Sequence, residues 1–483
     1  MKKSISFFLV ILFLFLYLCC LAACGGETSS PAQTTAAPEA VTTVAETEPE
    51  PPDGNFEGAD FNVLAAVEQW QEFYLAEMNG EVVNDAVYDR NRMTEEKYNI
   101  KLNYLVKNGY MGGMSEVHTA LSNSVMSGAG DYDFLIGGAF YVTGYVPEGL
   151  YADLRGYDQI GLDHPWYDRY VNEQFEVAGR QYLVSGALGV FGQAEAVVTF
   201  FNKNLAADYN LENLYDTVKS GKWTYGRLKE LGKVVTTDLD GDGKYGKSDR
   251  VGLVSSSDFM ALESGAMGYF YTEETSDGGR ILKDINEKLL AVNDLLCDLY
   301  ESDLYLMAPE LGGSNAYEHE DNMQNFFISD GTLFLIHKLD YARSERFREM
   351  ENFGILPSPK YDEAHENYIT PVPSEAFGIP AFVKDEEMSA VVLEGMQYLS
   401  YNTVNPAYFE TAIKRKSTRD EDSVEMLEII SSTKACDFMF LYTTSIGDIL
   451  YDIADRDYVS KWAKNYDVLQ AKMEEFVETV KGL

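Results

Sequence analysis

The chain has 483 residues, which is enough for about two or three domains. Hydrophobic residues make up 46% of it and charged residues 24%, so the composition is that of a folded globular protein rather than a disordered one. The formal net charge of -40 gives a surface that repels phosphate backbones and anionic lipid. We therefore expect no nucleic-acid partner and no peripheral helix held on acidic membrane lipid.

The N-terminus has the pattern of a secretory signal: two lysines, an apolar run, small residues and then a cysteine. The segment Leu21-Ala22-Ala23-Cys24 resembles the bacterial lipobox, whose cysteine receives a lipid and begins the mature chain. We predict a lipoprotein signal peptide over 1–23 and a lipid on Cys24, which would hold the protein on the outer face of the bacterial cell membrane. An uncleaved membrane helix over 5–23 is the alternative. The lack of a basic stop-transfer flank disfavours it.

Residues 24–56 are predicted to form a disordered tether. The stretch 27–54 is rich in Thr, Ala, Pro and Glu and contains no aromatic residue. Such a composition offers little apolar surface to bury, so it does not offset the entropy cost of folding.

Two cysteines, Cys297 and Cys436, lie in the globular part of the chain. The sequence does not decide whether they form a disulfide. Two separate buried thiols are the expectation, because a chain of this length buries a sufficient core without a disulfide.

From residue 57 on, short apolar runs alternate with amphipathic stretches, which predicts an α/β protein with largely parallel sheets. A C-terminal helix is also expected, because Trp462, Tyr466, Leu469, Met473, Phe476 and Val480 recur three or four residues apart. Strands are predicted at 61–65, 134–138, 182–184, 197–201, 252–254, 333–336 and 353–356. The other predicted helices are 84–98, 225–235, 282–300 and 388–401.

One local motif fits a twelve-residue calcium loop. The predicted ligands are Asp238, Asp240, Asp242, the Lys244 carbonyl and Asp249. Carboxylates at alternating positions of a turning loop point inward, and an acid at the last position closes the oxygen shell. Here the last acid is Asp rather than the longer Glu, which indicates a weak structural Ca²⁺ site. An acidic surface turn that binds no metal is the alternative.

The same loop also matches a phosphate-binding P-loop through Gly241, Gly246, Lys247 and Ser248. We reject this interpretation, because a P-loop needs amides that attract anions at the start of a helix. The surrounding aspartates repel phosphate, and no good helix-forming pattern follows the loop.

The sequence contains neither G-x-S-x-G nor H-E-x-x-H, the signatures of two hydrolase classes. A glycosidase needs only a pair of carboxylates, and 78 acidic residues always supply candidates, so sequence alone identifies no such pair. We expect a protein that is not an enzyme. A secreted glycan hydrolase and a surface glycan-adhesion protein remain the alternatives.

The segment Phe200-Phe201-Asn202-Lys203-Asn204-Leu205 resembles the "YNKdL" segment of extracellular solute-binding proteins of carbohydrate ABC importers. Trp223-Thr224 stands where that family has a Thr-Trp pair opening a helix, in reversed order. Further matches, each weak alone, follow in the family's order at Asp85–Asn91, Gly130–Asp133, Gly149–Leu154, Phe353–Pro357 and Tyr408–Asp420.

The resemblance implies a periplasmic-binding-protein-like fold, with two α/β lobes joined by a hinge around an interlobe cleft. Lobe 1 would take 57–185 and 346–405, and lobe 2 would take 186–345 and 406–483. It further implies a protein, expected to be a monomer, that binds a sugar or oligosaccharide between the lobes and delivers it to the transmembrane subunits of an ABC permease.

Sugar sites combine aromatic faces for the C–H face of a pyranose with polar groups for its hydroxyls. Groups of both kinds follow the ends of predicted strands, which favours a position at the cleft. Glu195 is the strongest candidate, because a relative in the family has a ligand-contacting Glu there. Trp166 and Tyr167 are interpreted as lobe packing instead. The predicted ligand-binding residues are Trp70, Phe140, Tyr141, Phe191, Gln193, Glu195, Phe259, His337 and Lys338.

Overall fold

The computed structural model describes residues 49–66, 74, 77–108, 114–347, 350, 352–413, 421–447, 449 and 452–483. Every contact discussed below lies within the unit Pro49–Leu483. The predicted signal peptide, Cys24 and Trp70 lie outside the described residues. Within the described part of the chain, no helix has the length and apolar character needed to cross a membrane.

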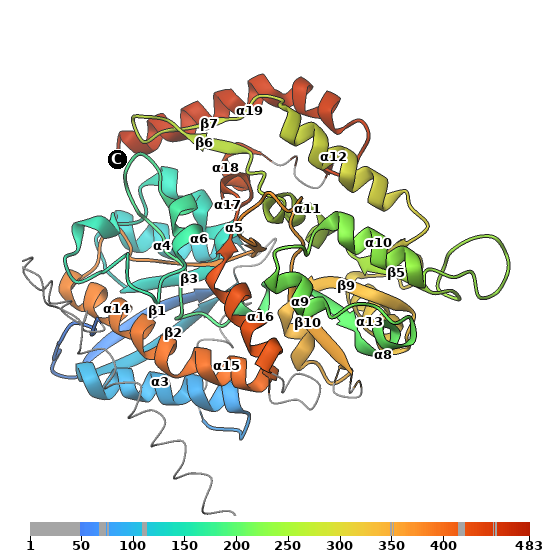
Figure 1. Ribbon diagram of the computed structural model, residues 1–483. Coiled ribbons are helices and arrows are strands. Elements are labelled where there is room, and N and C mark those ends of the chain that lie inside the picture. The colour runs from blue at the N-terminus through green and yellow to red at the C-terminus, as the bar shows by residue number, and fades with distance from the viewer. Residues whose placement is uncertain are drawn as a thin grey trace, which may run out of the picture. The chain divides into compact units, whose positions relative to one another are not determined.

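The first sheet has the strand order β12-β3-β1-β2 (Figure 1). Its strands are β1 (Ala59–Ala66), β2 (Ile100–Lys107), β3 (Phe134–Gly138) and β12 (Glu375–Gly378). β1 is parallel to β2 and β3, whereas β12 is antiparallel to β3. The predicted strands at 61–65 and 134–138 are thereby confirmed, and the whole of β3 is buried.

Helices α3 (Val82–Tyr98), α14 (Glu386–Asn402) and α15 (Val404–Ile413) pack against one another beside this sheet. Nearly every residue of α14 from Met388 to Ser400 is buried. The contact between α14 and α3 is close at Gly395, where a Cβ atom would lie 2.0 Å from the Tyr98 hydroxyl.

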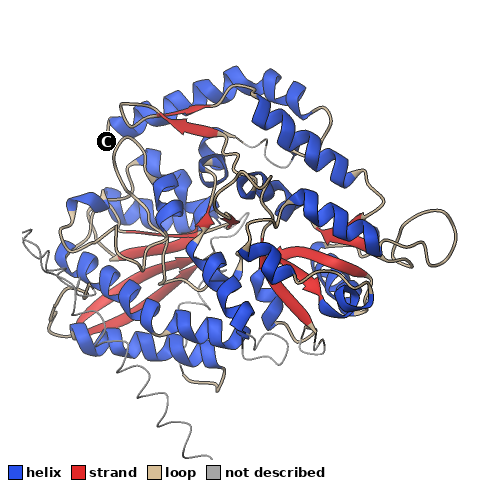
Figure 2. Cartoon of the chain, viewed as in Figure 1, coloured by secondary structure: helices blue, strands red, loops and turns tan. Residues whose placement is uncertain are grey.

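The second sheet has the order β10-β4-β9-β5-β8, with β4 antiparallel to both of its neighbours. Figure 2 shows its strands as a second red group, apart from the first sheet. β5 is parallel to β8 and β9, so this sheet is mixed rather than largely parallel. Its strands are β4 (Val197–Asn202), β5 (Val251–Ser255), β8 (Tyr305–Met307), β9 (Thr332–Lys338) and β10 (Phe353–Pro357).

Around this sheet, α10 begins at a capping Thr224, whose side chain accepts a hydrogen bond from the Arg227 amide. α10 then packs on β5 through two glycines, Gly232 and Gly252, where a Cβ atom on Gly252 would lie 2.6 Å from the Gly232 Cα. The principal helices of this part are α8 (Lys203–Asp208), α9 (Leu214–Lys219), α10 (Tyr225–Val235), α11 (Ser257–Ala266), α12 (Glu287–Tyr300) and α13 (Ala316–Ile328).

The end of the chain is helical, as predicted. α19 (Tyr458–Lys481) packs on β7, and the side chains of Trp462, Leu469 and Met473 are buried. Tyr466 of the predicted stripe is half-buried. The remaining elements are β6 (Thr272–Glu274), β7 (Arg280–Leu282), β11 (Thr370–Pro371), β13 (Lys434–Ala435), α4 (Met114–Ser127), α5 (Ala139–Val142), α6 (Arg169–Phe175), α7 (Phe191–Ala194), α16 (Glu421–Ser432), α17 (Phe438–Leu441), α18 (Thr443–Ile446) and the short 3-10 helices η2 (Thr143–Glu148), η3 (Leu154–Gly156), η4 (Ala308–Leu311) and η5 (Leu339–Arg343).

Two predicted boundaries are wrong. We expected lobe 1 to resume at 346, yet β10 pairs with β4 in the second sheet, in a register that runs from Phe353 opposite Asn202. The cause is that the chain completes the second sheet before it returns to the first through β12. The tether was expected to reach 56, but the Phe56 amide donates to the Tyr98 carbonyl at 2.9 Å and so joins the folded body.

The chain passes between the two sheets at least three times. It leaves β3 for β4, returns from β10 to β12, and leaves α14 for α16, which packs on β10. The predicted strand at 182–184 lies on the first of these paths. It forms only an isolated bridge, between Val184 and Phe377. Cys297 and Cys436 are both buried and free, as expected.

Candidate functional site

Four of the predicted ligand-binding residues come together where β4 begins and β9 ends. Because β4 and β9 are antiparallel, Val197 at the start of β4 pairs with Lys338 at the end of β9. Glu195 precedes β4, and its carboxylate lies 3.3 Å from the Lys338 ammonium. With Phe259 and His337 these residues form what we term the strand-end group.

A second carboxylate reaches the same ammonium. Glu320 of α13 lies 3.8 Å from Lys338, and it was not predicted, because nothing distinguishes it among the acidic residues of its helix. Burial raises the pKa of Glu195, with Lys338 opposing the shift. For Lys338, burial lowers the pKa, but the two carboxylates outweigh it and the pKa is raised. Lys338 therefore stays charged over the physiological range.

Aromatic rings cover the other side of the strand-end group. The His337 ring lies 4.1 Å from the Phe259 ring and 4.0 Å from the Tyr341 ring, with which it is stacked. His337 is 1% exposed, and burial followed by the nearby Lys338 charge lowers its pKa well below the usual value. The imidazole, kept neutral by this lowered pKa, thus packs between the Phe259 and Tyr341 rings.

Phe140 and Tyr141 form a second group on the first sheet's side. They follow β3 in α5, with their rings edge to face at 5.2 Å. The Phe140 ring also lies 5.7 Å from the Phe440 ring of α17. Phe440 in turn lines a small cavity with Leu262 of α11, the helix that carries Phe259. The aromatic groups of the two sheets are therefore linked through α17.

The remaining predicted residues lie elsewhere. Phe191 is half-buried at the start of α7. Gln193 lines a separate cavity of about 730 Å³, beside Trp166 and Tyr167. These last two rings are buried in the core, as the packing interpretation predicted, and they also form part of the cavity wall.

Comparison with known proteins was informative only at the level of structure, since no family model and no curated protein sequence matches the chain. A sugar transporter of Rhizobium etli, solved in an open conformation, covers 88% of this chain and 100% of its own length, with 13% identity and a TM-score of 0.58. The match to UspC of M. tuberculosis covers 86% of this chain and 100% of UspC, with 14% identity and a TM-score of 0.55. The match to the cyclic alpha-maltosyl-1,6-maltose binding protein of Arthrobacter globiformis covers 88% of this chain and 100% of that protein, with 15% identity and a TM-score of 0.52.

The chain has the two-lobed periplasmic-binding-protein-like fold. This confirms the predicted fold class. In this binding-protein fold, the strand-end group lies at the first passage of the chain between the sheets, where Glu195 links α7 to β4.

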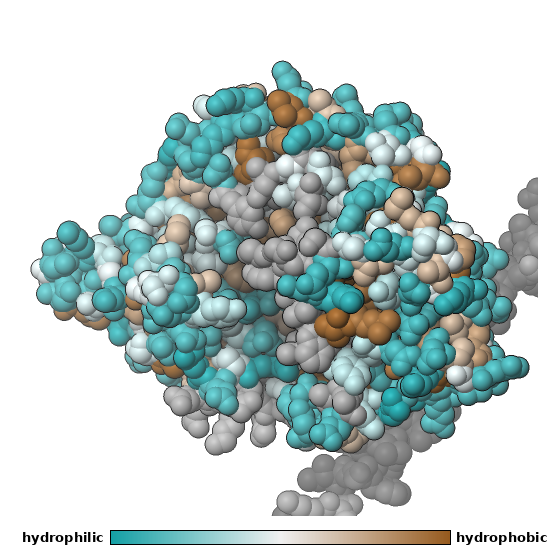
Figure 3. Space-filling view, turned by 180° about the vertical axis from the view of Figure 1, so that it is seen from behind, coloured by the Kyte–Doolittle hydropathy of each residue, from teal (hydrophilic) through white to brown (hydrophobic). Residues whose placement is uncertain are grey.

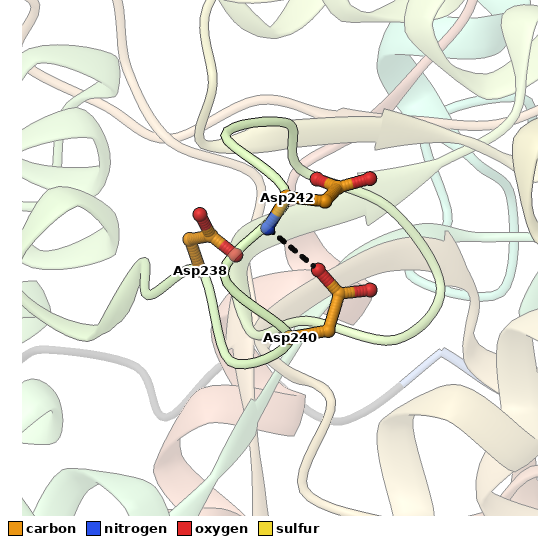
Figure 4. A group of neighbouring side chains, drawn as sticks. All are labelled: Asp238, Asp240 and Asp242. Carbon is orange, nitrogen blue, oxygen red and sulfur yellow. Dashed lines mark hydrogen bonds between the residues drawn. The ribbon is translucent and has the colours of Figure 1, made fainter.

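The predicted calcium loop lies between α10 and β5 of the binding-protein fold. Asp238, Asp240 and Asp242 converge, with one carboxylate oxygen of each within 4.8 Å of the others. Figure 4 shows these side chains around the turn, with the Asp242 amide donating to Asp240 Oδ1 at 3.1 Å. Gly241 and Gly243 have φ of 77° and 78°, a left-handed backbone that favours glycine.

Asp249, the predicted last ligand, does not belong to this cluster. Its Oδ1 accepts hydrogen bonds from the amides of Leu239 and Asp240, and its Oδ2 accepts one from Gly246. These amides hold the pKa of Asp249 below its usual value. Asp249 thus closes the base of the loop, whereas the three clustered carboxylates accept hydrogen bonds from amides within the turn itself, those of residues 241–244.

Proposed function

We propose that this protein is an extracytoplasmic substrate-binding lipoprotein that binds a sugar or oligosaccharide and delivers it to an ABC permease. The observation that carries the proposal is the strand-end group, a Glu195–Lys338 ion pair beside stacked aromatic rings, in a chain that shares its fold with sugar-binding proteins. Sugar binders need both kinds of group, for ring faces and for hydroxyls.

The charges of the strand-end group favour a neutral guest. Two carboxylates, Glu195 and Glu320, face the single Lys338 ammonium, so the group has no excess positive charge, and the chain as a whole is strongly acidic. An anionic solute would meet a repulsive field, whereas a hydroxyl can donate a hydrogen bond to the Glu195 carboxylate or accept one from the Lys338 ammonium. Figure 3 shows that hydrophilic residues cover much of the face turned away from Figure 1 and that this face is hollowed near its middle.

A saccharide screen tests the proposal. The melting temperature of the protein should rise with at least one of maltose, maltotriose, maltotetraose, cellobiose, xylobiose and lactose. Glu195→Ala should abolish that rise, whereas Glu212→Gln, which neutralises an exposed carboxylate paired with Arg227, should keep it. The absence of any shift across the panel would refute sugar binding. An unchanged shift in Glu195→Ala would show that the ligand lies elsewhere.

Anchoring by a lipid on Cys24 is part of the same proposal. Its support is the lipobox-like segment Leu21-Ala22-Ala23-Cys24 after an apolar run. Mass spectrometry of the N-terminal peptide from membranes should give a diacylglyceryl cysteine at position 24. Cys24→Ser should release the protein or leave the signal uncleaved. An unmodified mature N-terminus would contradict the anchor.

We also propose that Asp238, Asp240 and Asp242 bind Ca²⁺ as a structural ion. Three carboxylates so close together repel one another; loop amides that donate to them offset part of this repulsion, and a cation between them would offset more. Ca²⁺ takes six to eight oxygen ligands, which leaves room for carbonyls and water. The ion would stiffen the turn between α10 and β5 and would take no part in ligand binding.

A further inference from the structure

The cavity that Gln193 lines is separate from the strand-end group. α7 is a single helical turn, and residues two apart on a helix are rotated by about 200° about its axis, so Gln193 and Glu195 point to opposite sides. None of the strand-end residues lines the cavity. Its walls come from 165–170 and from α14, α15 and α16, which follow one another in Figure 1.

The floor of this cavity is polar and buried. Gln193 is 3% exposed, and its side-chain amide makes no hydrogen bond to any residue in the described part of the chain. Beside it, Lys434 Nζ lies 2.8 Å from Asp168 Oδ1, and both side chains are largely buried. Asn405 Oδ1, which also belongs to the cavity lining, is buried without a hydrogen-bond partner among the described residues, at a cost of roughly 1–3 kcal/mol that a ligand hydroxyl would recover.

The walls are aromatic. Tyr170 and Tyr401 are 46% and 40% exposed, so each presents ring surface, and half-buried Phe409 lies between α14 and α16. Trp166 and Tyr167 are held behind them by Glu394, which accepts hydrogen bonds from the Trp166 indole N–H at 3.1 Å and the Tyr167 hydroxyl at 2.6 Å. Trp166 and Tyr167 are thus fixed in position before any ligand arrives.

Charge and size restrict the ligand. Asp168 is paired with Lys434, and Arg169 is paired with Glu173. Glu428 on the rim adds negative charge, so an anion is disfavoured. A cavity of about 730 Å³ falls within the range of small-molecule sites, which is roughly 300–1,000 Å³.

We propose that this cavity is a second binding site, which takes a neutral saccharide of one or two rings, with the ring faces against Tyr170, Tyr401 and Phe409 and the hydroxyls on Gln193 and the Asp168–Lys434 pair. The proposal goes beyond the transport role, because the site lies on the opposite side of α7 from the strand-end group. A bound sugar would bridge the 165–170 segment and α16.

Titration calorimetry of the protein and its variants with glucose, maltose, cellobiose, xylobiose and lactose tests this site. The wild type should show two binding events per chain with at least one sugar. Glu195→Ala should remove one event, and Gln193→Leu, which keeps side-chain volume, should weaken the other by about tenfold or more. Tyr401→Ala should act like Gln193→Leu, whereas Phe382→Ala, which removes an aromatic ring of similar exposure outside the cavity, should change neither event.

The outcomes separate this site from the transport role. A single event that Glu195→Ala removes and the cavity variants leave unchanged overturns the second site and leaves the proposed function standing. A single event that the cavity variants remove and Glu195→Ala leaves unchanged supports the cavity and contradicts the strand-end group. Binding of no sugar in the panel overturns both.

Discussion

The Lys338 ammonium lies 3.3 Å from the Glu195 carboxylate at the point where β9 ends and β4 begins. Both side chains are less than one quarter exposed, at 23% and 19%. An ion pair in such a place is screened less than one at the surface, yet each partner has lost much of its hydration. Removal of one partner therefore leaves the other charge partly buried and alone.

A double-mutant cycle of Lys338→Met and Glu195→Gln should show this coupling. Each single variant should lower the free energy of unfolding, and the double variant should lose less than their sum, with an interaction energy of about 1–2 kcal/mol. The measurement is urea unfolding at pH 7. The exposed pair Arg227–Glu230 is the control, with a coupling below about 0.5 kcal/mol. Additive losses at Lys338 and Glu195 would contradict the ion pair.

Stability should fall as pH rises from about 5 to 8, and Glu375 should contribute to that slope. Its carboxylate oxygens have no hydrogen-bond partner among the described residues. Burial, opposed by Lys434 and reinforced by Asp168, raises the pKa of Glu375 to about 8. The folded state then binds more protons than the unfolded state between the two pKa values. The contribution of Glu375 to the free energy of unfolding is therefore fully present at low pH and is lost as the pH rises through about 8.

The Glu375→Gln variant should flatten the slope and be more stable than the wild type at pH 8.5 by about 2–4 kcal/mol. Thermal or urea unfolding at several pH values gives the comparison. Burial also raises the pKa of Glu263, to about 7, so Glu263 gives the wild type and the variant the same slope. The difference in stability between wild type and Glu375→Gln at each pH therefore isolates the effect of Glu375. Glu96→Gln, at an exposed position, is the control. Parallel pH profiles for Glu375→Gln and the wild type would contradict the assignment.

Calcium should raise the melting temperature, and EDTA should lower it, if Asp238, Asp240 and Asp242 hold the ion. Asp240→Asn removes one charged ligand and should abolish the response, because three carboxylates provide the only charge in the cluster. Asp303→Asn, at an exposed position elsewhere, should keep the response. Equal melting curves with Ca²⁺ and with EDTA would favour the acidic surface turn.

The Gly252→Ala variant should destabilise the second sheet. A Cβ atom at Gly252 would lie 2.6 Å from the Gly232 Cα, and backbone atoms on both sides leave no flexible side chain to move away. The expected loss is about 1–3 kcal/mol or more in urea unfolding. The control is Gly226→Ala in α10, the helix that meets Gly252 through Gly232; at Gly226 the nearest atom would be 3.6 Å away and the change should be neutral or slightly stabilising. Equal stability of the two variants would show that α10 moves freely on β5.

The sequence predicts elements whose signal is local. The apolar runs that became β1, β3, β4 and β9, and the three-to-four spacing of Trp462, Leu469 and Met473 in α19, need no knowledge of distant residues. The strand with which β10 pairs cannot be predicted from local sequence. Nothing between 353 and 357 indicates that it pairs with β4 rather than with the first sheet.

The same dependence on the fold explains why the sequence predicted the candidate site only in part. Gln193 and Glu195 were both predicted to bind ligand, and in an extended strand residues two apart do share a face. The chain instead forms the helical turn α7 there, so the two side chains diverge. Glu320 reaches the strand-end group from α13, which only the fold brings near it, whereas Tyr341 lies in η5, directly after β9, and was within reach of local reasoning.

The repeated passage of the chain between the sheets has a consequence for dissection of the molecule. The first sheet is not encoded by one continuous stretch, since β12 returns to it after all five strands of the second have formed between 197 and 357. A protease nick in any one connection would leave the halves covalently joined through another. Expression of the half built on the first sheet alone therefore demands a spliced gene, and new termini placed in one connection give a single permuted chain only if the native termini are joined.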